Sequence, residues 1–200
     1  LTIDANGVYE TEEDKAELLW HELQNAYRSK RILSGVLSGV EETSSGSIAV
    51  VYYKGQRMII PVSEMELNLS EQNGYGEMKG RQVRILNNMV GCEIDFILIA
   101  LDDVVASRRL AMLAKRRKFY FLNENGSVQI TEGRVVQARV IAVAEKVVRL
   151  EVFGAECAVP ARDIAWEWVG DAREKYHVGD RVMAVVTSVE SDAETMNVKI

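Results

Sequence analysis

Apolar and polar positions follow two different periods along this chain. Between Thr11 and about residue 30, apolar side chains recur every three or four positions, which is the period of an amphipathic helix. Thr11 followed three residues later by Asp14 forms a capping signature. We predict one helix over residues 12–30 that packs on the structure following it, with the apolar positions Ala16, Leu19, Trp20, Leu23, Ala26 and Tyr27.

Beyond Ile32 the pattern changes to short extended segments rich in Val, Ile, Leu and Tyr and separated by Gly, Ser, Asn and Asp. Such segments are typical of β-strands joined by turns. Many short strands favour small β-barrels or sandwiches over parallel sheets with crossover helices. The expected strands cover residues 32–41, 47–53, 56–62 and 92–101, and then 133–143, 146–153, 155–160, 180–189 and 194–200.

The two sets of strands are aligned by an internal repeat. A glycine and a proline stand at the same separation in both halves, and these are the only prolines in the chain. The glycine supplies the positive φ of a tight hairpin, and the proline ends a strand's ladder. The aligned pairs of segments are Gly55–Pro61 with Gly154–Pro160, Val90-Gly91 with Val178-Gly179, and Gly35–Val40 with Ala138–Val143.

We therefore predict a mainly β protein with two tandem five-stranded barrels. An N-terminal helical segment covers residues 1–31, the first barrel 32–106, a basic helix and linker 107–130, and the second barrel 131–200. The segment 68–79, with two glycines, is interpreted as a mobile loop inserted into the first copy. Asp102-Asp103 is interpreted as a tight turn between its last two strands.

The order Gly-x-Val, strand, Gly, strand ending at Pro61-Val-Ser-Glu-Met65, Val-Gly and long strand resembles the RNA-binding domain of ribosomal protein S1. The helix Trp20–Tyr27 is also similar to the start of S1 proteins, and the resemblance covers about residues 15–200. It implies OB-fold barrels that bind single-stranded RNA, such as mRNA, with little sequence preference and in translation. The ribosome or a ribosomal protein is a further partner that it implies.

The chain departs from the S1 pattern on the face that usually binds nucleic acid. That family usually carries aromatic residues on the second strand and a histidine at the end of the third. Here the aromatics of the first copy are shifted to Tyr52 and Tyr53, Pro61 follows Ile60 where the histidine is expected, and the second copy has no aromatic residue before Phe153. RNA binding is therefore expected mainly of the first copy.

Charge is unevenly distributed along the chain, whose net charge is −6. Residues 1–30 carry seven acidic against three basic residues, residues 31–125 eleven against twelve, and residues 126–200 twelve against nine. Indiscriminate coating of duplex DNA rests on many Lys and Arg contacts to phosphate, which this balance argues against. The middle of the chain holds most of the potential for phosphate contact.

The first candidate site lies around the hairpin between the second and third strands. Single-strand binders combine a positive groove with flat side chains on which bases stack. Tyr52, Tyr53, Lys54 and Arg57 supply both kinds of group on the strands that OB-folds use for binding. Because side chains alternate along a strand, only one tyrosine can face the groove. The alternative is that one tyrosine fills the core and the other is an ordinary surface residue.

The second candidate is the segment 107–118, with six basic residues and no acidic one. On a helix, Arg108, Arg109, Lys115 and Arg116 share a face around Met112, where they could contact phosphate. The alternative is a basic helix that links the two barrels, or that docks on the acidic N-terminal helix or on the second copy.

Weaker candidates stand in the second copy. Lys146 and Arg149 lie among acidic residues, so any positive groove there is weak. Trp166 and Trp168 are expected to pack against the barrel or to contact a partner.

Several classes of protein find no support in the sequence. No apolar segment approaches the length that crosses a bilayer, and no export signal is present, so we expect a cytoplasmic protein without membrane contact. Cys92 and Cys157 fall in different predicted domains, so we expect no disulfide. The chain begins with Leu1 and stops within an expected strand, which indicates a fragment.

Catalytic and metal-binding patterns are also missing from the sequence. His21 and His177 have no neighbour at metal-ligand spacing, and neither a phosphate-binding Gly-rich loop nor a G-x-S-x-G motif occurs. We therefore expect a binding protein without cofactor or metal, not an enzyme. The alternative function is a scaffold whose barrels have lost their nucleic-acid faces and dock on a ribosomal or other protein.

Overall fold

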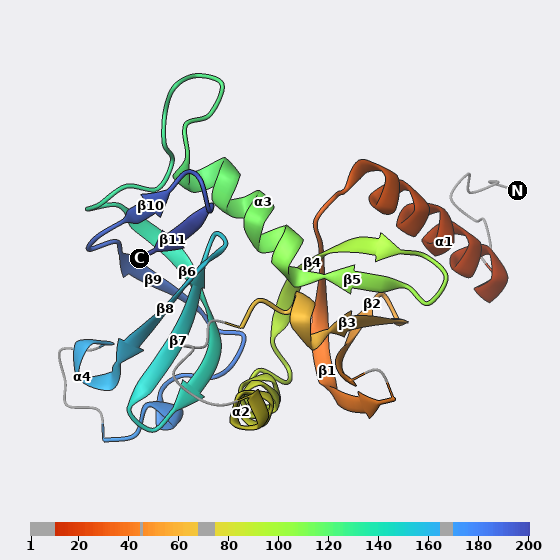
Figure 1. The fold of residues 1–200 in the computed structure, drawn as a ribbon, viewed down its shortest axis with the longest axis horizontal. Coiled ribbons are helices and arrows are strands. Elements are labelled where there is room, and N and C mark those ends of the chain that lie inside the picture. Colours follow the sequence, from red (N-terminus) through yellow and green to blue (C-terminus); the bar gives the residue numbers. More distant parts are fainter. Residues whose placement is uncertain (1–10, 45, 68–74, 165–169) are drawn as a thin grey trace, which may run out of the picture.

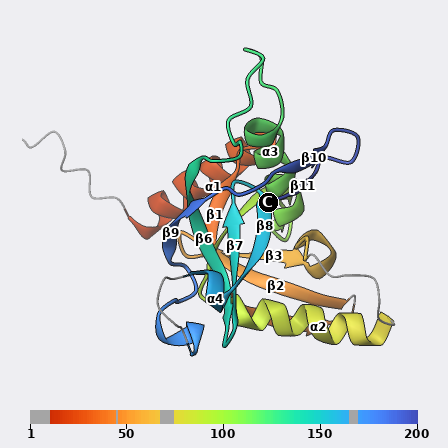
Figure 2. The same ribbon diagram turned by 90° about the vertical axis from the view of Figure 1, so that its left-hand side faces the viewer.

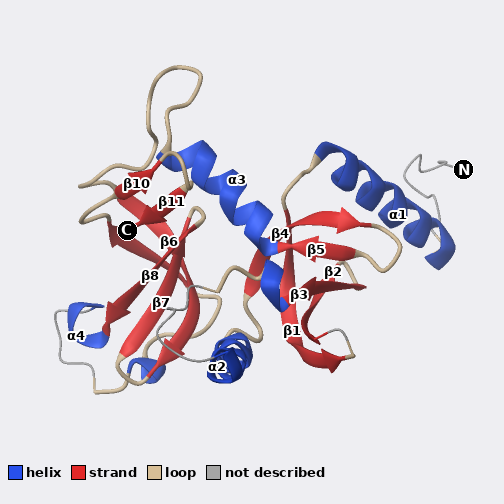
Figure 3. Ribbon diagram, in the orientation of Figure 1, coloured by secondary structure: helices blue, strands red, loops and turns tan. Residues whose placement is uncertain are grey.

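The computed structural model describes residues 11–44, 46–67, 75–164 and 170–200. Its strands gather in two groups, with helices beside and between them (Figures 1 and 3). Helix α1, Glu12–Ser29, begins at the predicted capping box, in which Thr11 and Asp14 bond reciprocally. It ends at Lys30, whose left-handed conformation allows its N–H to reach the last carbonyls. Leu23 and Ala26 are buried on its inner face, so the predicted amphipathic helix is confirmed.

The first group of strands is a closed five-stranded barrel, as predicted. Its order is β1-β2-β3-β5-β4. Alternate side chains fill the interior, because successive residues of a strand point to opposite faces; among them are Leu37, Val51, Met58, Ile60 and Phe96. The strands are β1 Leu33–Thr43, β2 Gly46–Tyr53, β3 Gln56–Pro61, β4 Glu93–Ala100 and β5 Val105–Ser107. The Asp102-Asp103 segment forms the predicted turn before β5.

A helix stands in the connection between β3 and β4, where the sequence predicted a loop. A short 3-10 helix, η1 Val62–Glu64, follows β3, and helix α2 covers Tyr75–Asn88. The loop prediction is wrong for residues 75–79, and residues 68–74 lie outside the described residues. Leu86 and Met89 are buried in the barrel core three residues apart, which supports a helix despite the glycines at its start. Helix α2 contacts both β1 and β6 (Figure 2).

Helix α3, Arg108–Tyr120, runs from the end of β5 toward the second group of strands (Figure 1). The hydroxyl of Ser107 caps it by accepting a hydrogen bond from the N–H of Leu110. Its buried residues include Ala111, Met112 and Tyr120. The predicted basic helix is therefore present, and it packs along β4 of the barrel.

The second group is an open four-stranded sheet with the order β8-β7-β6-β9. The two last strands form a separate ribbon, so the predicted second closed barrel does not form within the described residues. The expected strands 180–189 and 194–200 are each shortened, and β11 lies near β8 without pairing to it. The elements are β6 Val135–Ala144, β7 Val147–Val152, β8 Ala155–Pro160, α4 Ala161–Ile164, η2 Ala172–Glu174, β9 Arg181–Val185, β10 Glu190–Asp192 and β11 Asn197–Lys199.

The aligned segments of the two halves share their local geometry. Gly55 and Gly154 have φ angles of 84° and 98° in the β2–β3 and β7–β8 hairpins. Gly91 N–H donates to the carbonyl of Leu37, and Gly179 N–H to that of Val140, at 2.8 Å in both halves. The strand register shifts directly after Leu37 in β1 and after Val140 in β6. Each residue of β1 therefore corresponds to the residue 103 positions later in β6. Val36, which pairs with Tyr52 of β2, corresponds to Arg139, which pairs with Glu151 of β7.

Candidate nucleic-acid interface

The outer face of the barrel presents one aromatic side chain between two strands. Tyr52 on β2 is 44% exposed and pairs with Val36 on β1, which is 48% exposed, and with Arg57 on β3. Residues that pair directly across strands lie on the same face of a sheet. Arg57 is exposed and forms an ion pair with Glu41 at 2.7 Å. This face therefore combines a ring, an aliphatic neighbour and a cation.

Tyr53 lies on the opposite face of β2, as alternation predicts. Its ring meets Phe96 edge-on in the core, with centroids 6.4 Å apart. Its hydroxyl donates to Glu22 of α1 at 2.8 Å, and Lys54 donates to the other oxygen of Glu22 at 2.6 Å. Lys54 and Tyr53 together hold the pKa of Glu22 below its usual range. Both predicted site residues thus anchor α1 to the hairpin.

The corresponding face of the second sheet is covered. Arg139, Glu151 and Glu156 stand at the positions that Val36, Tyr52 and Arg57 occupy in the barrel. All three side chains are at most 16% exposed. Their partners include Arg108 and Lys115 of α3 and Asp95 of β4, so this face forms the junction between the two groups of strands.

Arg108 is the most deeply buried cation of α3, with a side chain 2% exposed. It donates to the carbonyl of Met65 at 2.9 Å and to Glu156 of β8 at 2.6 Å. Burial alone lowers the pKa of Arg108, but Glu156 raises it above its usual range. In this arrangement Arg108 has no surface to offer a phosphate.

Lys115, about two turns further along α3, completes a cluster of four charged side chains. It bonds to Asp95 of β4 and to Glu151 of β7, the latter at 2.9 Å. Arg139 of β6 contacts the same two carboxylates, at 3.2 Å from Asp95 and 3.8 Å from Glu151. Burial raises the pKa of Asp95, but Lys115, Ser34 and Arg139 together bring it below its usual range.

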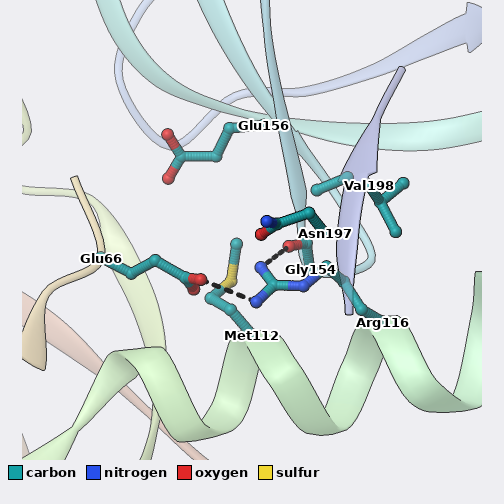
Figure 4. A pocket seen from close by; sticks show the side chains of 8 residues that line it. Glu66, Met112, Arg116, Gly154, Glu156, Asn197 and Val198 are labelled. Atoms are coloured by element: carbon teal, nitrogen blue, oxygen red, sulfur yellow. Dashed lines mark hydrogen bonds and ion pairs between the residues drawn. The ribbon is translucent and has the colours of Figure 1, made fainter. Parts of the chain in front are cut away.

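Arg116 lies in a small pocket between α3, the second sheet and the segment after β3 (Figure 4). It donates to the carbonyl of Gly154 at 3.0 Å and to Glu66 at 2.7 Å. Nε of Arg116 and Oε2 of Glu66 are buried and make no hydrogen bond. Such orphaned atoms in a polar pocket are suited to an ordered water molecule. Asn197 and Val198 of β11 complete the lining.

The face of α3 around Met112 therefore points inward. Arg109, at the margin of that face, pairs with Glu64 at 3.0 Å and is about half exposed. The geometry corresponds to the alternative in which the basic helix links the two halves and docks on the second. The acidic partners Asp95, Glu151 and Glu156 were not predicted from the sequence, although alternation along β4, β7 and β8 places their side chains away from the core.

The two candidates of the second half differ from each other. Lys146 is exposed in the β6–β7 turn. Arg149 is 26% exposed and lies 3.3 Å from Glu156. Trp166 and Trp168 lie outside the described residues. Of the ten predicted site residues, Tyr52 and Arg57 are brought together on an open face.

The described ranges contain neither a cluster of metal-ligating side chains nor a helix that could span a membrane. No group of three or more His, Cys, Asp or Glu residues is arranged there to hold a metal ion. None of the described helices has both the length and the apolar character needed to span a bilayer.

The barrel has an outer face with an exposed aromatic and an exposed basic side chain. The two halves of the chain also share their strand register and a hairpin glycine. Residues 129–200 match the S1 RNA binding domain family. The resemblance predicted from the sequence is thereby confirmed. The S1 match falls on the half whose β7–β8 face is covered, and the open face with Tyr52 belongs to the preceding barrel.

Two curated relatives extend the S1 similarity to most of the chain. Both are small ribosomal subunit protein bS1, one from Coxiella burnetii and one from Neisseria meningitidis serogroup B. They are 24% and 26% identical to this chain over 96% of its length, and the alignments cover 33% and 32% of the relatives. The chain thus spans about a third of the length of these relatives.

Proposed function

We propose that this chain binds single-stranded RNA, such as mRNA, with little sequence preference, in the cytoplasm and in translation. The observation that carries the proposal is the exposed ring of Tyr52 between Val36 and Arg57 on an uncovered barrel face. A base stacked on such a ring contributes about 1–3 kcal/mol, largely independent of its identity. The S1 match and the bS1 relatives agree with RNA as the ligand.

The proposed site acts by binding alone, without cofactor or metal. Arg57 contacts a phosphate beside the stacked base, exchanging its ion pair with Glu41. Exposed ion pairs of this kind contribute about 0–1 kcal/mol, so a phosphate can replace the carboxylate at small cost. Lys146 and Arg109 are further cations at the edges, whereas Arg108, Lys115 and Arg116 hold the two halves together.

We further propose that the chain consists of two OB-type units, 32–106 and 131–200, joined by the basic helix and linker 107–130 and preceded by the helical segment 1–31. The shared hairpin geometry and strand register support this division. The first unit supplies the RNA face. The second unit is fixed to it through its own strand face.

The test is a fluorescence anisotropy titration with a labelled single-stranded oligoribonucleotide. We expect Tyr52→Ala to weaken binding by about tenfold, the loss equivalent to one stack of roughly 1.4 kcal/mol. Tyr52→Phe keeps the ring and is expected to retain affinity. Arg57→Ala should weaken binding, while Arg162→Ala, which removes an exposed arginine from the ion pair with Asp163, is the matched control.

Salt dependence gives a second measurement of the same site. With about two phosphates neutralised on a single strand, the affinity should fall about sevenfold between 50 and 200 mM salt. Equal affinities of the native chain, Tyr52→Ala and Arg57→Ala for the oligomer would refute the proposed face.

A protein-docking scaffold is the second candidate function. It is favoured by the covered face of the second sheet and by exposed apolar residues on β6 and β9, namely Val135, Met183 and Val185. A ribosome or ribosomal protein is the partner class for this function. Failure of RNA binding together with capture of the chain by isolated ribosomal subunits would favour the scaffold.

A further inference from the structure

An apolar patch lies on the outer face of the second sheet, on strands β6 and β9. Val135, Met183 and Val185 are 58%, 67% and 60% exposed. Val135 pairs with Val185, and Met183 pairs with Gln137, so the three apolar side chains lie on one face of the sheet. Single exposed apolar residues are ordinary, but neighbouring ones on a sheet indicate a contact surface.

The same positions are covered in the barrel. Val36 of β1 pairs with Glu93 of β4, and its counterpart Arg139 of β6 pairs with Arg181 of β9. Each residue of β4 therefore corresponds to the residue 88 positions later in β9. By this alignment Met183 corresponds to Asp95 and Val185 to Ile97. Both barrel residues are 5% exposed, because helix α3 packs along β4 and Lys115 bonds to Asp95.

The apolar patch is continuous with the junction between the two halves. Arg181, two residues before Met183 on β9, lies 3.4 Å from Glu93 of the barrel. Arg139, its pairing partner on β6, contacts Glu93 and Asp95. The junction thus ends where the uncovered apolar residues begin.

We propose that the β6/β9 patch, Val135, Met183 and Val185, is a docking surface for an amphipathic α-helix that packs there as α3 packs on β4. The docking helix belongs to another protein and resembles α3 in being basic and amphipathic. It places an apolar side chain over Met183, as α3 places Lys115 over the corresponding Asp95 in the barrel. RNA is a poorer occupant, because these aliphatic side chains offer no ring on which a base could stack. The docking surface does not depend on the proposed RNA site.

The probe is a synthetic peptide with the sequence of residues 107–121 carrying Lys115→Leu. A covalent link between positions 110 and 114, on the side opposite Met112, holds the peptide helical, and circular dichroism verifies its helicity before use. Binding to the full chain is followed through the methyl signal of Met183 by nuclear magnetic resonance. We expect saturable shifts of this signal, with at least tenfold tighter binding than for the linked peptide that keeps Lys115.

Variants of the full chain complete the test. Met183→Glu changes an exposed position that needs no repacking, and it should weaken binding of the Lys115→Leu peptide at least tenfold. Val147→Glu, at a 39% exposed valine of β7 outside the patch, is the matched control and should bind as the native chain does. Both variants should keep the RNA affinity measured at Tyr52, which separates failure of this proposal from failure of the RNA site.

Three outcomes would overturn the docking surface. They are an unchanged Met183 signal with a verified helical peptide, equal affinity of the two peptides, and equal affinity of Met183→Glu and the native chain. A Met183 signal that responds to the RNA oligomer and not to the peptide would likewise reject a helix as the occupant.

Discussion

Nη2 of Arg108 lies 2.6 Å from Oε1 of Glu156, and their side chains are only 2% and 4% exposed. One residue begins the helix that leaves the barrel, and the other stands on β8 of the second sheet. A cation that the sequence analysis assigned to RNA is therefore matched by an acid of the same chain. This buried pair joins the two halves of the chain.

Removal of Arg108 alone is expected to be strongly destabilising. Arg108→Met leaves Glu156 buried with Arg149 as its remaining ion-pair partner, 3.3 Å away. Breaking one side of a buried pair costs about 3–5 kcal/mol. Urea denaturation should report a fall of this size in the free energy of unfolding. Arg57→Met, which removes an exposed pair with Glu41, should change it by less than about 1 kcal/mol.

A double variant distinguishes loss of the whole ion pair from the cost of leaving Glu156 buried without Arg108. Arg108→Met with Glu156→Leu removes both charges together, and apolar replacement of a whole buried pair is often tolerated. The double variant should therefore be more stable than Arg108→Met alone. A loss equal to the sum of the two single variants would contradict this coupling.

Acid should weaken the junction through Asp95. Its pKa is lowered in the folded chain, where the attraction of Lys115 and the hydrogen bond from Ser34 outweigh the effect of burial. As pH falls, the unfolded chain therefore binds a proton at this site before the folded chain does. The stabilisation is fully present above the ordinary aspartate pKa of about 3.9 and is lost as pH falls toward the lower folded value.

Asp95→Asn tests this assignment. The variant should be less stable than the native chain at neutral pH, and its stability should fall less between pH 5 and pH 3 when measured by urea denaturation. Asp103→Asn, in the exposed turn before β5, is the control and should keep the native pH profile. An identical acid response in Asp95→Asn and the native chain would place the pH dependence elsewhere.

The thiol of Cys92 should report opening of the same junction. Burial raises the pKa of Cys92 to about 11, and its Sγ lies 3.8 Å from the carbonyl of Val140 on β6. The thiolate is the reactive form, so alkylation at pH 8 should be about a hundredfold slower than in the unfolded chain. Iodoacetamide labelling followed by peptide mass spectrometry measures this rate.

Arg108→Met should accelerate that labelling, since it loosens the contact between barrel and second sheet. If Cys92 in the native chain reacts as fast as in urea, the junction opens readily and the described contact does not protect it.

The local features of the fold could be predicted because nearby residues determine them. Thr11 and Asp14 mark the start of α1, and Gly55 and Gly154 mark two hairpins whose φ angles need glycine or a similar residue. Alternation also separated Tyr52 from Tyr53 correctly. Helix α2 was missed because the glycines near its start suggested a loop, whereas Leu86 within it and Met89 directly after it are buried by contacts with residues far away in sequence.

The direction of α3 could not be predicted from its own residues. The four cations around Met112 could pair equally well with the phosphates of a nucleic-acid strand or with a row of carboxylates. The choice depends on Asp95, Glu151 and Glu156, which lie on three different strands and meet α3 only after both halves have folded. The second barrel does not close within the described residues, because β10 and β11 pair with each other and not with the sheet β8-β7-β6-β9.

The two repeat glycines give the last prediction, with one serving as the control for the other. Gly55 and Gly154 occupy equivalent hairpin turns with positive φ, so alanine at either position incurs a backbone cost of about 1–2 kcal/mol. An added Cβ at Gly55 meets no atom within 4 Å, whereas at Gly154 it would lie 2.5 Å from the carbonyl oxygen of Met112 and 2.8 Å from Cβ of Lys115. Because that carbonyl belongs to the backbone of α3, Gly154→Ala forces the helix away from the second sheet.

We expect Gly154→Ala to lower the free energy of unfolding by about 1–3 kcal/mol more than Gly55→Ala, the usual cost of overpacking, and to speed alkylation of Cys92. Equal losses in the two variants would show that α3 does not pack on this hairpin as described.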